Sequence, residues 1–310
     1  MPPLWEVVAI LASDLHLSHK SPLARSCEPD WYKAMARPLY QVRQLMMDYK
    51  CPLIVAGDIF DRWNAPAELI NWTLIHLPRC YAVPGQHDLP NHSYKDIRRS
   101  AYWTLCQAGL VTNIEPRQPM ETPTKTPLRL HGFPFGFRIR PPKDVHDMLI
   151  EVAVVHKYVW IKGQSYTDAP RDQRLRAYAP DLKGYNVALF GDNHKGFDWA
   201  MGSGCRVVNC GGFMRRKCDE QSYKPSVGLL YADGTVSRHY LDTKEDQFVS
   251  PEKLVLAALK GAEMLDFVEE LKGLGDRAID FRQAVERALQ KENADEETRR
   301  IVLEAFDKFQ

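Results

Sequence analysis

Five apolar, β-branched runs along this chain each stop at a short polar cluster. The runs are VVAILA from residue 7, PLIVA from 52, CYAV from 80, EVAVV from 151 and NVALF from 186. Strands that are apolar on both faces are buried between layers, as in α/β proteins. Ligand sites in open α/β sheets form beyond the carboxyl ends of the strands, so the clusters that follow these runs can converge in space. The pattern therefore predicts an α/β fold with one polar site.

The connections between the first runs are helical in pattern. Apolar residues at helical spacing predict helices over residues 31–49, 68–77 and 94–108, which gives a β-α-β-α-β opening. Pro38 lies inside the first of these and should kink the helix or mark a restart. Four prolines within residues 115–128 predict a loop. Beyond the fifth run the chain turns to short β-rich segments, and Asp233-Gly234 predicts a hairpin turn.

The end of the chain differs from the rest in pattern and in charge. Residues 251–310 read as helices throughout and carry 10 Lys and Arg against 14 Asp and Glu, a balance of −4 that leaves +5 for residues 1–250. We expect a domain over residues 1–250 that carries the chemistry and a helical C-terminal extension over residues 251–310. The basic balance permits a polyanionic partner for the domain, whereas the acidic extension would repel phosphates.

Composition narrows the cellular setting. No run of about 18 apolar residues is present, and the chain shows no basic leader before its first apolar run, so we expect no membrane segment and no signal peptide. The seven cysteines are scattered, without a Cys-x-x-Cys pair. They are typical of a reduced, cytoplasmic protein rather than of a disulfide framework or a zinc cluster.

The polar clusters hold the residue types of a metal centre. Asp14 and His16 lie two residues apart, so on an extended chain their side chains point the same way and can hold one ion. Asp58, His87, His156 and His194 follow later runs. Carboxylates, imidazoles and a side-chain amide suit two hard or borderline divalent ions. A bridging carboxylate keeps such ions about 3.5–4 Å apart, which suits in-line attack on a phosphoryl group.

In this order, the clusters resemble the motifs of the calcineurin-like metallophosphoesterases. They stand here as Asp14-Leu15-His16, Gly57-Asp58-Ile59-Phe60-Asp61, Gly85-Gln86-His87-Asp88, His156 and Gly191-Asp192-Asn193-His194. The resemblance covers about residues 6–241. Within the superfamily, SDLHL, GDIFD and the His-Asp pair look most like the SbcD-like DNA-repair nuclease subunits.

The resemblance implies a four-layer α/β/β/α sandwich and a specific division of roles. One metal ion would be held by Asp14, His16, Asp58 and His194, and the other by Asp58, Gln86, His156 and Asp192, with Asp58 as the bridge. His87 would protonate the leaving alkoxide, and Asp88 would orient the His87 ring. Asp61 is expected to support the ligands by hydrogen bonding.

Two positions depart from the family pattern. The family usually has Asn at the position of Gln86 and His at the position of Asp192. Gln offers the same carbonyl oxygen on a longer stem, while Asp adds negative charge and hardens the second metal position. The Asp192 change favours Mn²⁺, with Mg²⁺ as the alternative, over Zn²⁺, and both changes fall on the same metal.

Weaker signals concern the substrate. Asn209-Cys210-Gly211-Gly212 followed by Met214-Arg215-Arg216 resembles the late glycine turn and basic residue of the SbcD-like branch. Arg215 and Arg216 could contact phosphate or could form a solvated turn. Tyr158 and Trp160 could stack on a base or could pack in the core.

We therefore expect metal-dependent phosphodiester hydrolysis, above all of DNA, by a nuclease subunit. A phosphatase or phosphodiesterase of small phosphoesters is one alternative, and a weakly active subunit that mainly binds is another. The resemblance makes an SMC-type ATPase a candidate partner for the extension. Homodimerisation and packing on the core are the alternatives for the apolar stripes of residues 251–310.

Overall fold

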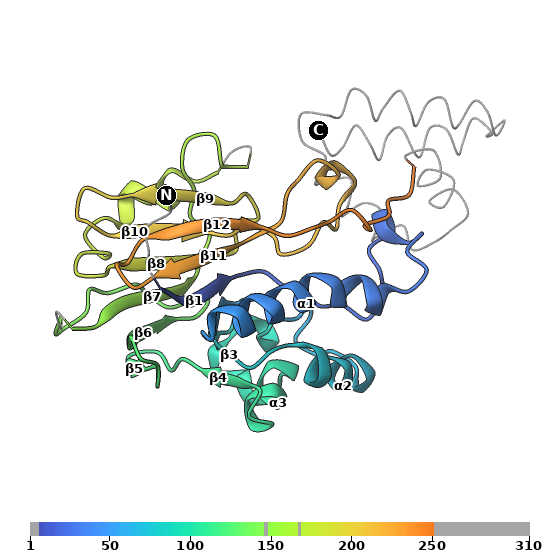
Figure 1. The fold of residues 1–310 in the computed structure, drawn as a ribbon, viewed down its shortest axis with the longest axis horizontal. Coiled ribbons are helices and arrows are strands. Elements are labelled where there is room, and N and C mark those ends of the chain that lie inside the picture. Colours follow the sequence, from blue (N-terminus) through green and yellow to red (C-terminus); the bar gives the residue numbers. More distant parts are fainter. Residues whose placement is uncertain (1–5, 146–147, 167–168, 251–310) are drawn as a thin grey trace. The chain divides into compact units, whose positions relative to one another are not determined.

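The computed structural model describes residues 6–145, 148–166 and 169–250. Two mixed six-stranded sheets pack against each other (Figure 1). The first has the order β12 (Val236–Tyr240), β11 (Ser226–Tyr231), β1 (Val7–Ala12), β2 (Leu53–Ala56), β3 (Cys80–Val83) and β4 (Val111–Asn113). The second has the order β5 (Met120–Glu121), β6 (Leu128–Phe133), β7 (Ile150–His156), β8 (Val187–Gly191), β10 (Arg206–Asn209) and β9 (Phe197–Ala200).

The central strands of both sheets are parallel, and antiparallel strands lie outside them. β1 to β4 run parallel to one another, as do β6, β7, β8 and β10. The antiparallel pairs are β1 with β11, β11 with β12, β5 with β6 and β9 with β10. The carboxyl ends of β1, β2 and β3 therefore share one edge of the first sheet, and those of β7 and β8 share one edge of the second.

Alternating side chains on the strands fill two apolar layers. Leu11 and Ile54 of the first sheet pack with Val154 of the second in the layer between the sheets. Val155 and Phe190 point the other way, into a cluster on the outer face of the second sheet. Burying such a side chain is worth about 1.5–3 kcal/mol, which is why these runs are apolar on both faces.

Three α-helices are found among the described residues of the first half of the chain: α1 (Trp31–Tyr49), α2 (Ala67–His76) and α3 (Ala101–Gln107). α1 continues through Pro38, so the predicted restart there is wrong. The helix predicted over residues 94–108 is divided into the 3-10 helix η3 (Tyr94–Arg99) and α3. Ser100 separates them because its hydroxyl accepts the Trp103 amide and caps α3.

The predicted α/β sandwich is confirmed, with one difference in its outermost layer. Beyond the second sheet, the described residues form irregular segments and the 3-10 turns η4 (Arg171–Gln173) and η5 (Leu175–Tyr178). Their apolar residues, such as Leu175 and Leu182, pack on the sheet. The hairpin at Asp233-Gly234 joins β11 and β12 as predicted, and Gly234 adopts a φ of 80°.

The chain divides into two compact units. The first comprises Met1–His19, Met35–Met214 and Pro225–Thr243, and the second comprises Lys20–Ala34, Arg215–Lys224 and Lys244–Gln310. Both sheets lie in the first unit. The predicted helices of residues 251–310, with the dimer or partner contacts expected of them, lie outside the described residues.

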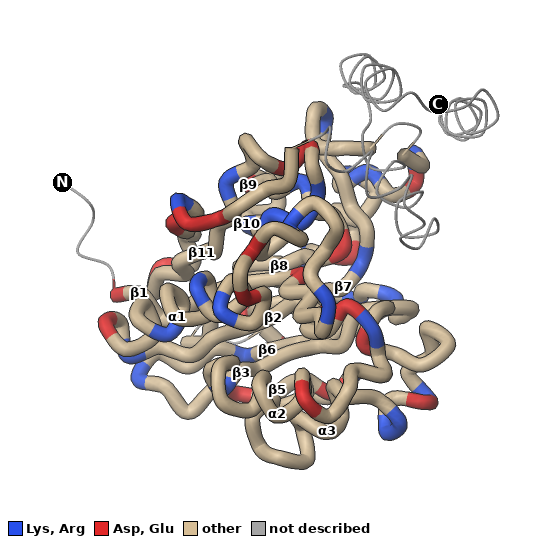
Figure 2. The backbone as a smooth tube through the Cα atoms, turned by 90° about the vertical axis from the view of Figure 1, so that its right-hand side faces the viewer, with Lys and Arg blue, Asp and Glu red and all other residues tan. Residues whose placement is uncertain are grey.

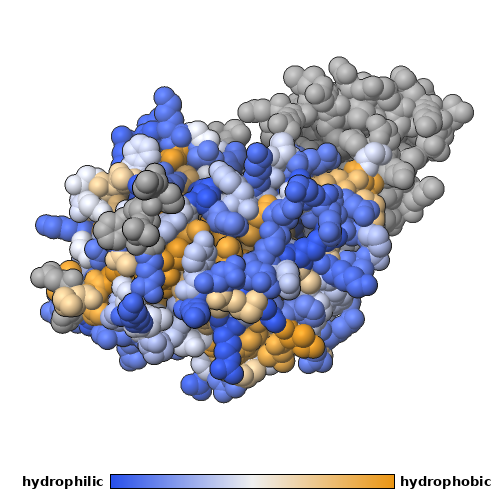
Figure 3. Space-filling view, viewed as in Figure 1, coloured by the Kyte–Doolittle hydropathy of each residue, from blue (hydrophilic) through white to orange (hydrophobic). Residues whose placement is uncertain are grey.

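Three further observations concern surfaces and thiols. Across the described residues, no helix combines the length and the apolar character needed to cross a bilayer. All seven cysteines are free thiols. Apolar surface remains exposed over α2 (Figure 3), where Leu74 is 37% and Ile75 is 69% exposed.

Candidate metal centre

Loops that follow five parallel strands bring the predicted polar residues together. They are Asp14 and His16 after β1, Asp58 and Asp61 after β2, Gln86, His87 and Asp88 after β3, His156 at the end of β7, and Asp192 and His194 after β8. Three sets among them place their donor atoms within 4.8 Å of one another: Asp14 with His16 and His194, His16 with Asp58 and His87, and Asp14 with Asp58 and His156. The sets overlap, so they form one centre.

Asp58 lies between the two halves of this centre. Its Oδ2 is 3.7 Å from Nε2 of His16 and 3.4 Å from Nε2 of His156. Its Oδ1 accepts the backbone amide of His87 at 2.9 Å, which fixes the carboxylate plane. Burial opposes ionisation, but the neighbouring imidazoles, His156 above all, hold the pKa of Asp58 below its usual range. A carboxylate in this position can bridge two cations.

In Asp14, as in Asp58, one carboxylate oxygen accepts a backbone amide and the other has no hydrogen-bond partner among the described residues. Oδ1 of Asp14 accepts the backbone amide of Asp192 at 2.9 Å. Its Oδ2 and Oδ2 of Asp58 are buried and have no hydrogen-bond partner among the described residues. Burial raises the pKa of Asp14 to about 7. Buried carboxylate oxygens without partners are costly, and a divalent cation is the group that would satisfy both. The residues present thus fit a metal ion.

His156 presents one nitrogen to the centre. Its Nδ1 lies 2.6 Å from the carbonyl oxygen of Ala56, and its Nε2 lies 2.6 Å from Oε1 of Gln86. Burial alone would lower the pKa of His156, but the Asp58 carboxylate raises it to about 10. Because Nδ1 is fixed by a carbonyl, Nε2 is the nitrogen available to a cation.

Gln86 and Asp192, the two departures from the family pattern, contact each other. Nε2 of Gln86 donates to Oδ1 of Asp192 at 2.7 Å. This bond turns the amide oxygen of Gln86 toward His156 and away from Asp192. The oxygen is thus presented beside the proposed ligand His156. Oδ1 of Asp192 is occupied by the side-chain amide of Gln86, and metal ligation by Asp192 stays a prediction.

His87 is oriented by a residue other than the one expected. Its Nδ1 lies 2.8 Å from the carbonyl oxygen of Asp61, and its ring meets the His16 ring edge-on at a centroid distance of 5.0 Å. The prediction that Asp88 orients this ring is wrong. The Asp88 carboxylate is fully buried and accepts the amides of Ile59, Phe60 and Gly85 at 3.0–3.2 Å. Asp88 therefore ties the loop after β2 to the loop after β3.

The loops approach so closely that glycine is required at three positions around the centre, and at Gly191 a Cβ atom would lie 2.1 Å from the carbonyl oxygen of Ala56. A Cβ atom at Gly85 would lie 2.1 Å from Oδ1 of Asp58. A Cβ atom at Gly57 would lie 2.1 Å from Nδ1 of His156, and the φ of Gly57 is +87°. Asp14, His16 and Asp58 also have positive φ values, between 46° and 54°. Such strained backbone in proposed ligands is typical of functional sites.

Asn193 is a supporting residue that the sequence motifs did not single out as such. Its buried Nδ2 donates to the carbonyl oxygens of Val159 and Gln164, both at 2.9 Å. These bonds hold the loop that carries His194 against the loop that follows His156. The sequence places Asn193 between the proposed ligands Asp192 and His194, and that position alone does not distinguish a supporting residue from a metal ligand.

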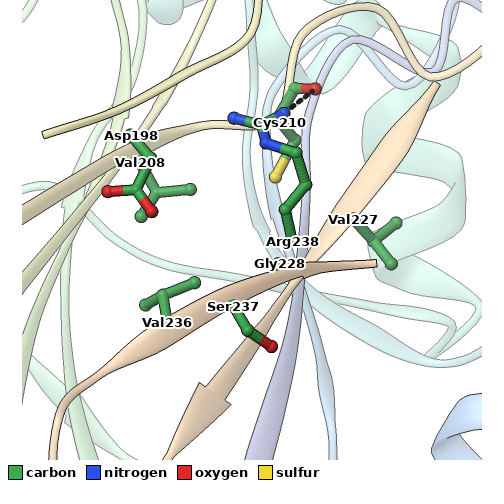
Figure 4. A pocket seen from close by; sticks show the side chains of 8 residues that line it. All are labelled: Asp198, Val208, Cys210, Val227, Gly228, Val236, Ser237 and Arg238. Carbon is green, nitrogen blue, oxygen red and sulfur yellow. Dashed lines mark hydrogen bonds between the residues drawn. The ribbon is translucent and has the colours of Figure 1, made fainter. Parts of the chain in front are cut away.

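Arg238 is a second supporting residue that the sequence did not indicate. Arg238 lies on β12, and its guanidinium donates to the carbonyl oxygens of Cys210 at 3.2 Å and Asn209 at 3.0 Å. It also lines a small pocket between the sheets (Figure 4). The turn that it holds continues to Gly212, whose amide donates to the carbonyl of His194. Arg238 thus acts on the centre through backbone, which a strand pattern cannot reveal.

The predicted phosphate contacts fall in the second unit. Nε of Arg215 donates to Asp246 at 2.9 Å, and its guanidinium carbon lies 5.2 Å from the Phe248 ring. Its side chain is only 12% exposed. The structure therefore engages Arg215 in an ion pair, and its proposed contact with phosphate stays a prediction. The backbone amide of Arg216 donates to Glu220, and its proposed contact with phosphate stays a prediction.

Comparison with known proteins gives one family and several structures. The family model described as calcineurin-like phosphoesterase matches residues 9–196. A search of curated proteins finds no match. TT1561 of Thermus thermophilus is 13% identical at a TM-score of 0.44, covering 76% of this chain and 98% of that one. The 5'-nucleotidase from Candida albicans is 13% identical at a TM-score of 0.46, and the match covers 93% of this chain and 59% of that one. The calcineurin-like phosphoesterase YfkN from Bacillus subtilis is 12% identical at a TM-score of 0.44, and the match covers 84% of this chain and 97% of that one.

Proposed function

This chain belongs to the calcineurin-like phosphoesterases, and on that premise we propose that it is a two-metal phosphodiesterase that cleaves DNA. Metal-dependent phosphoester hydrolysis follows from the family and from the cluster of candidate ligands. The observation that carries the metal centre of this proposal is the pair of buried oxygens on Asp14 and Asp58, which lie among imidazoles and have no hydrogen-bond partner among the described residues.

The proposed ligands form two overlapping sets. Asp14, His16, Asp58 and His194 would hold one ion, and Asp58, Gln86, His156 and Asp192 would hold the other. When bound, two divalent ions supply positive charge against the phosphoryl oxygens and lower the pKa of water. Mn²⁺ is the proposed metal and Mg²⁺ the alternative, because the Asp192 carboxylate stands in the second set where the family usually has the softer imidazole.

The protein's own residues would position the substrate and move the proton. The Asp61 carbonyl fixes the proton of His87 on Nδ1, so a proton passed to the leaving oxygen must come from Nε2 of the charged ring. The His87 amide is tied to Asp58, which keeps the ring at a fixed place beside the proposed bridge. His87 is thus the proposed general acid.

DNA as the substrate is supported by the SDLHL, GDIFD and His-Asp motifs, which resemble SbcD-like nucleases. Lys and Arg are interspersed with Asp and Glu over the described backbone and form no single field (Figure 2). Specific side chains near the centre, and not a broad basic surface, would therefore have to grip the phosphates.

The test is incubation of the full chain with labelled single- and double-stranded DNA and with a small phosphodiester, in Mn²⁺, Mg²⁺ or EDTA. We expect metal-dependent DNA cleavage that EDTA and Asp58→Asn abolish. Turnover of the small ester alone would replace the proposal with a phosphodiesterase of small molecules. No metal-dependent turnover at all would favour a subunit that mainly binds.

We further propose that residues 251–310 receive a protein partner, either an SMC-type ATPase or a second copy of this chain. The support is the resemblance together with the apolar stripes of this segment. Light scattering of the chain with and without these residues, alone and mixed with a candidate ATPase, tests the proposal. An unchanged assembly state and no lost partner would contradict it.

A further inference from the structure

Two loops at the centre are joined into one surface. Residues 157–166 follow His156, and residues 192–195 contain Asp192 and His194. Asn193 donates to the carbonyls of both Val159 and Gln164. The pair of loops is thus fixed directly beside two of the proposed metal ligands.

The outward side of these loops carries two tyrosines and a lysine. The Tyr158 hydroxyl accepts the amide of Tyr166 at 3.1 Å, and the two rings lie 6.0 Å apart with an interplanar angle of 30°. Nζ of Lys195 lies 4.8 Å from the centroid of the Tyr166 ring and donates to the carbonyl of Ser165 at 2.8 Å. We call Tyr158, Tyr166 and Lys195 the aromatic wall.

The wall lies at the surface, whereas another aromatic residue of the same loop is tied by a hydrogen bond to the segment that follows it. Tyr166 is 41% exposed although Lys195 lies over its ring, and Lys195 is exposed as well. Trp160, which the sequence also offered for stacking, donates its Nε1 to the carbonyl of Pro170, and the Arg174 guanidinium lies 5.0 Å over its ring. Of the aromatic residues proposed from the sequence, Tyr158 therefore remains as a candidate, and the structure adds Tyr166.

The chemistry of the wall suits one unit of a nucleic acid. An exposed tyrosine ring offers a face on which any base can stack, whatever its sequence. An ammonium has three donors, so Lys195 can keep its contact with Ser165 and still meet a phosphate. Lys195 follows the proposed ligand His194 directly in the chain, so its charge is carried by the same loop as that ligand. A base can stack on a side chain only where it is unpaired.

We infer that the aromatic wall is a subsite for an unpaired nucleotide next to the scissile phosphate. The base lies against Tyr166 and Tyr158, and Lys195 contacts the neighbouring phosphate. This inference rests on the proposed function, since it names the form in which the substrate enters the same centre. It predicts preference for single strands and frayed ends over closed duplex.

The test compares a single-stranded oligonucleotide with an abasic oligonucleotide of the same length, which keeps every phosphate and removes the bases. On the base-bearing strand, Tyr166→Leu should raise KM about 5- to 100-fold, the range expected for one lost stacking contact, with kcat within about twofold. On the abasic strand, Tyr166→Leu should change nothing. Tyr166→Phe should behave as the original chain on both strands.

Lys195→Met and Tyr40→Leu complete the set. Lys195→Met should raise KM on both strands and weaken the dependence of affinity on salt. Tyr40 on α1 is 63% exposed, so Tyr40→Leu removes a tyrosine of similar exposure from outside the wall and should leave both substrates unaffected. An equal loss by Tyr166→Leu on both strands, or no loss on either, overturns the inference.

Binding measured by fluorescence anisotropy separates this inference from the proposed function. If the chain cleaves no DNA, the proposed function fails, and the affinities for the two strands still decide the subsite. Weaker binding of the base-bearing strand by Tyr166→Leu, with unchanged binding of the abasic strand, supports the wall. No detectable binding of either strand by the original chain refutes it.

Discussion

Replacing Gly85 with alanine should displace the proposed bridging carboxylate. The added Cβ would lie 2.1 Å from Oδ1, 2.6 Å from Cγ and 2.7 Å from the backbone nitrogen of Asp58. Carbon and oxygen in ordinary contact are about 3.4 Å or more apart, so the carboxylate must retreat by about 1 Å. That shift breaks the bond between Oδ1 and the His87 amide. It also moves Oδ2 away from His16 and His156.

The size of the effect follows from these displacements. A misplacement of about 1 Å in a reacting group costs about 10²-fold in rate. Forcing a methyl group into a filled site costs about 1–3 kcal/mol of stability. We therefore expect Gly85→Ala to bind Mn²⁺ at least ~10-fold more weakly, to lose about 100-fold in kcat/KM, and to unfold at lower denaturant while remaining folded in buffer.

Calorimetric titration with Mn²⁺, turnover and urea denaturation would measure the three quantities. Gly212→Ala is the matched control, because its Cβ would meet nothing closer than 3.7 Å although it lies beside His194. It should stay within about twofold of the original chain in all three. If Gly85→Ala keeps the original affinity for Mn²⁺, the Asp58 carboxylate is not the bridge and the proposed centre is wrong.

Three further outcomes are expected. His87→Gln should keep its Mn²⁺ and lower kcat by about 10²–10⁴-fold, as measured by calorimetry and initial rates, whereas loss of the metal would make His87 a ligand. The double change Gln86→Asn with Asp192→His should shift preference from Mn²⁺ toward Zn²⁺ in competition titrations, and an unchanged preference would argue against ligation by either. Because Asp58 raises the pKa of His156 to about 10, a metal at Nε2 must displace a proton below that pH. Metal affinity should therefore rise as pH increases toward 10, with about one proton released between pH 8 and 9. Titrations in buffers of different ionisation enthalpy measure that proton, and a release near zero would count against ligation by Nε2.

The sequence predicted the strands best where an apolar run stood alone. β1, β2, β3, β7 and β8 were each visible as such a run. β6 was missed because its six residues, LRLHGF, include charged and polar side chains and follow the proline-rich loop directly. The division of the third helix at Ser100 was missed because a helical apolar pattern continues across the cap.

Chain order predicted which residues meet at the centre but not how they contact one another. Asp88 is next to His87 in the sequence, yet its carboxylate turns inward to the amides of Ile59 and Phe60. The carbonyl that orients His87 belongs to Asp61, 26 residues away. Backbone carbonyls carry no residue-specific signal, so no sequence pattern could have assigned this contact.

The two central carboxylates, Asp14 and Asp58, each have two roles that side-chain type alone does not predict. Asp14 and Asp58 each give one oxygen to a backbone amide of another loop, Asp192 and His87 respectively. Each leaves its second oxygen buried without a hydrogen-bond partner among the described residues. The bonds to the backbone amides hold the loops in register, and the second oxygen of each carboxylate is left for a cation. Each of these oxygens costs about 1–3 kcal/mol of stability while it is unsatisfied. The same two residues therefore link the loop structure to metal binding. A cation that satisfies them would stabilise the fold as well as the reaction site.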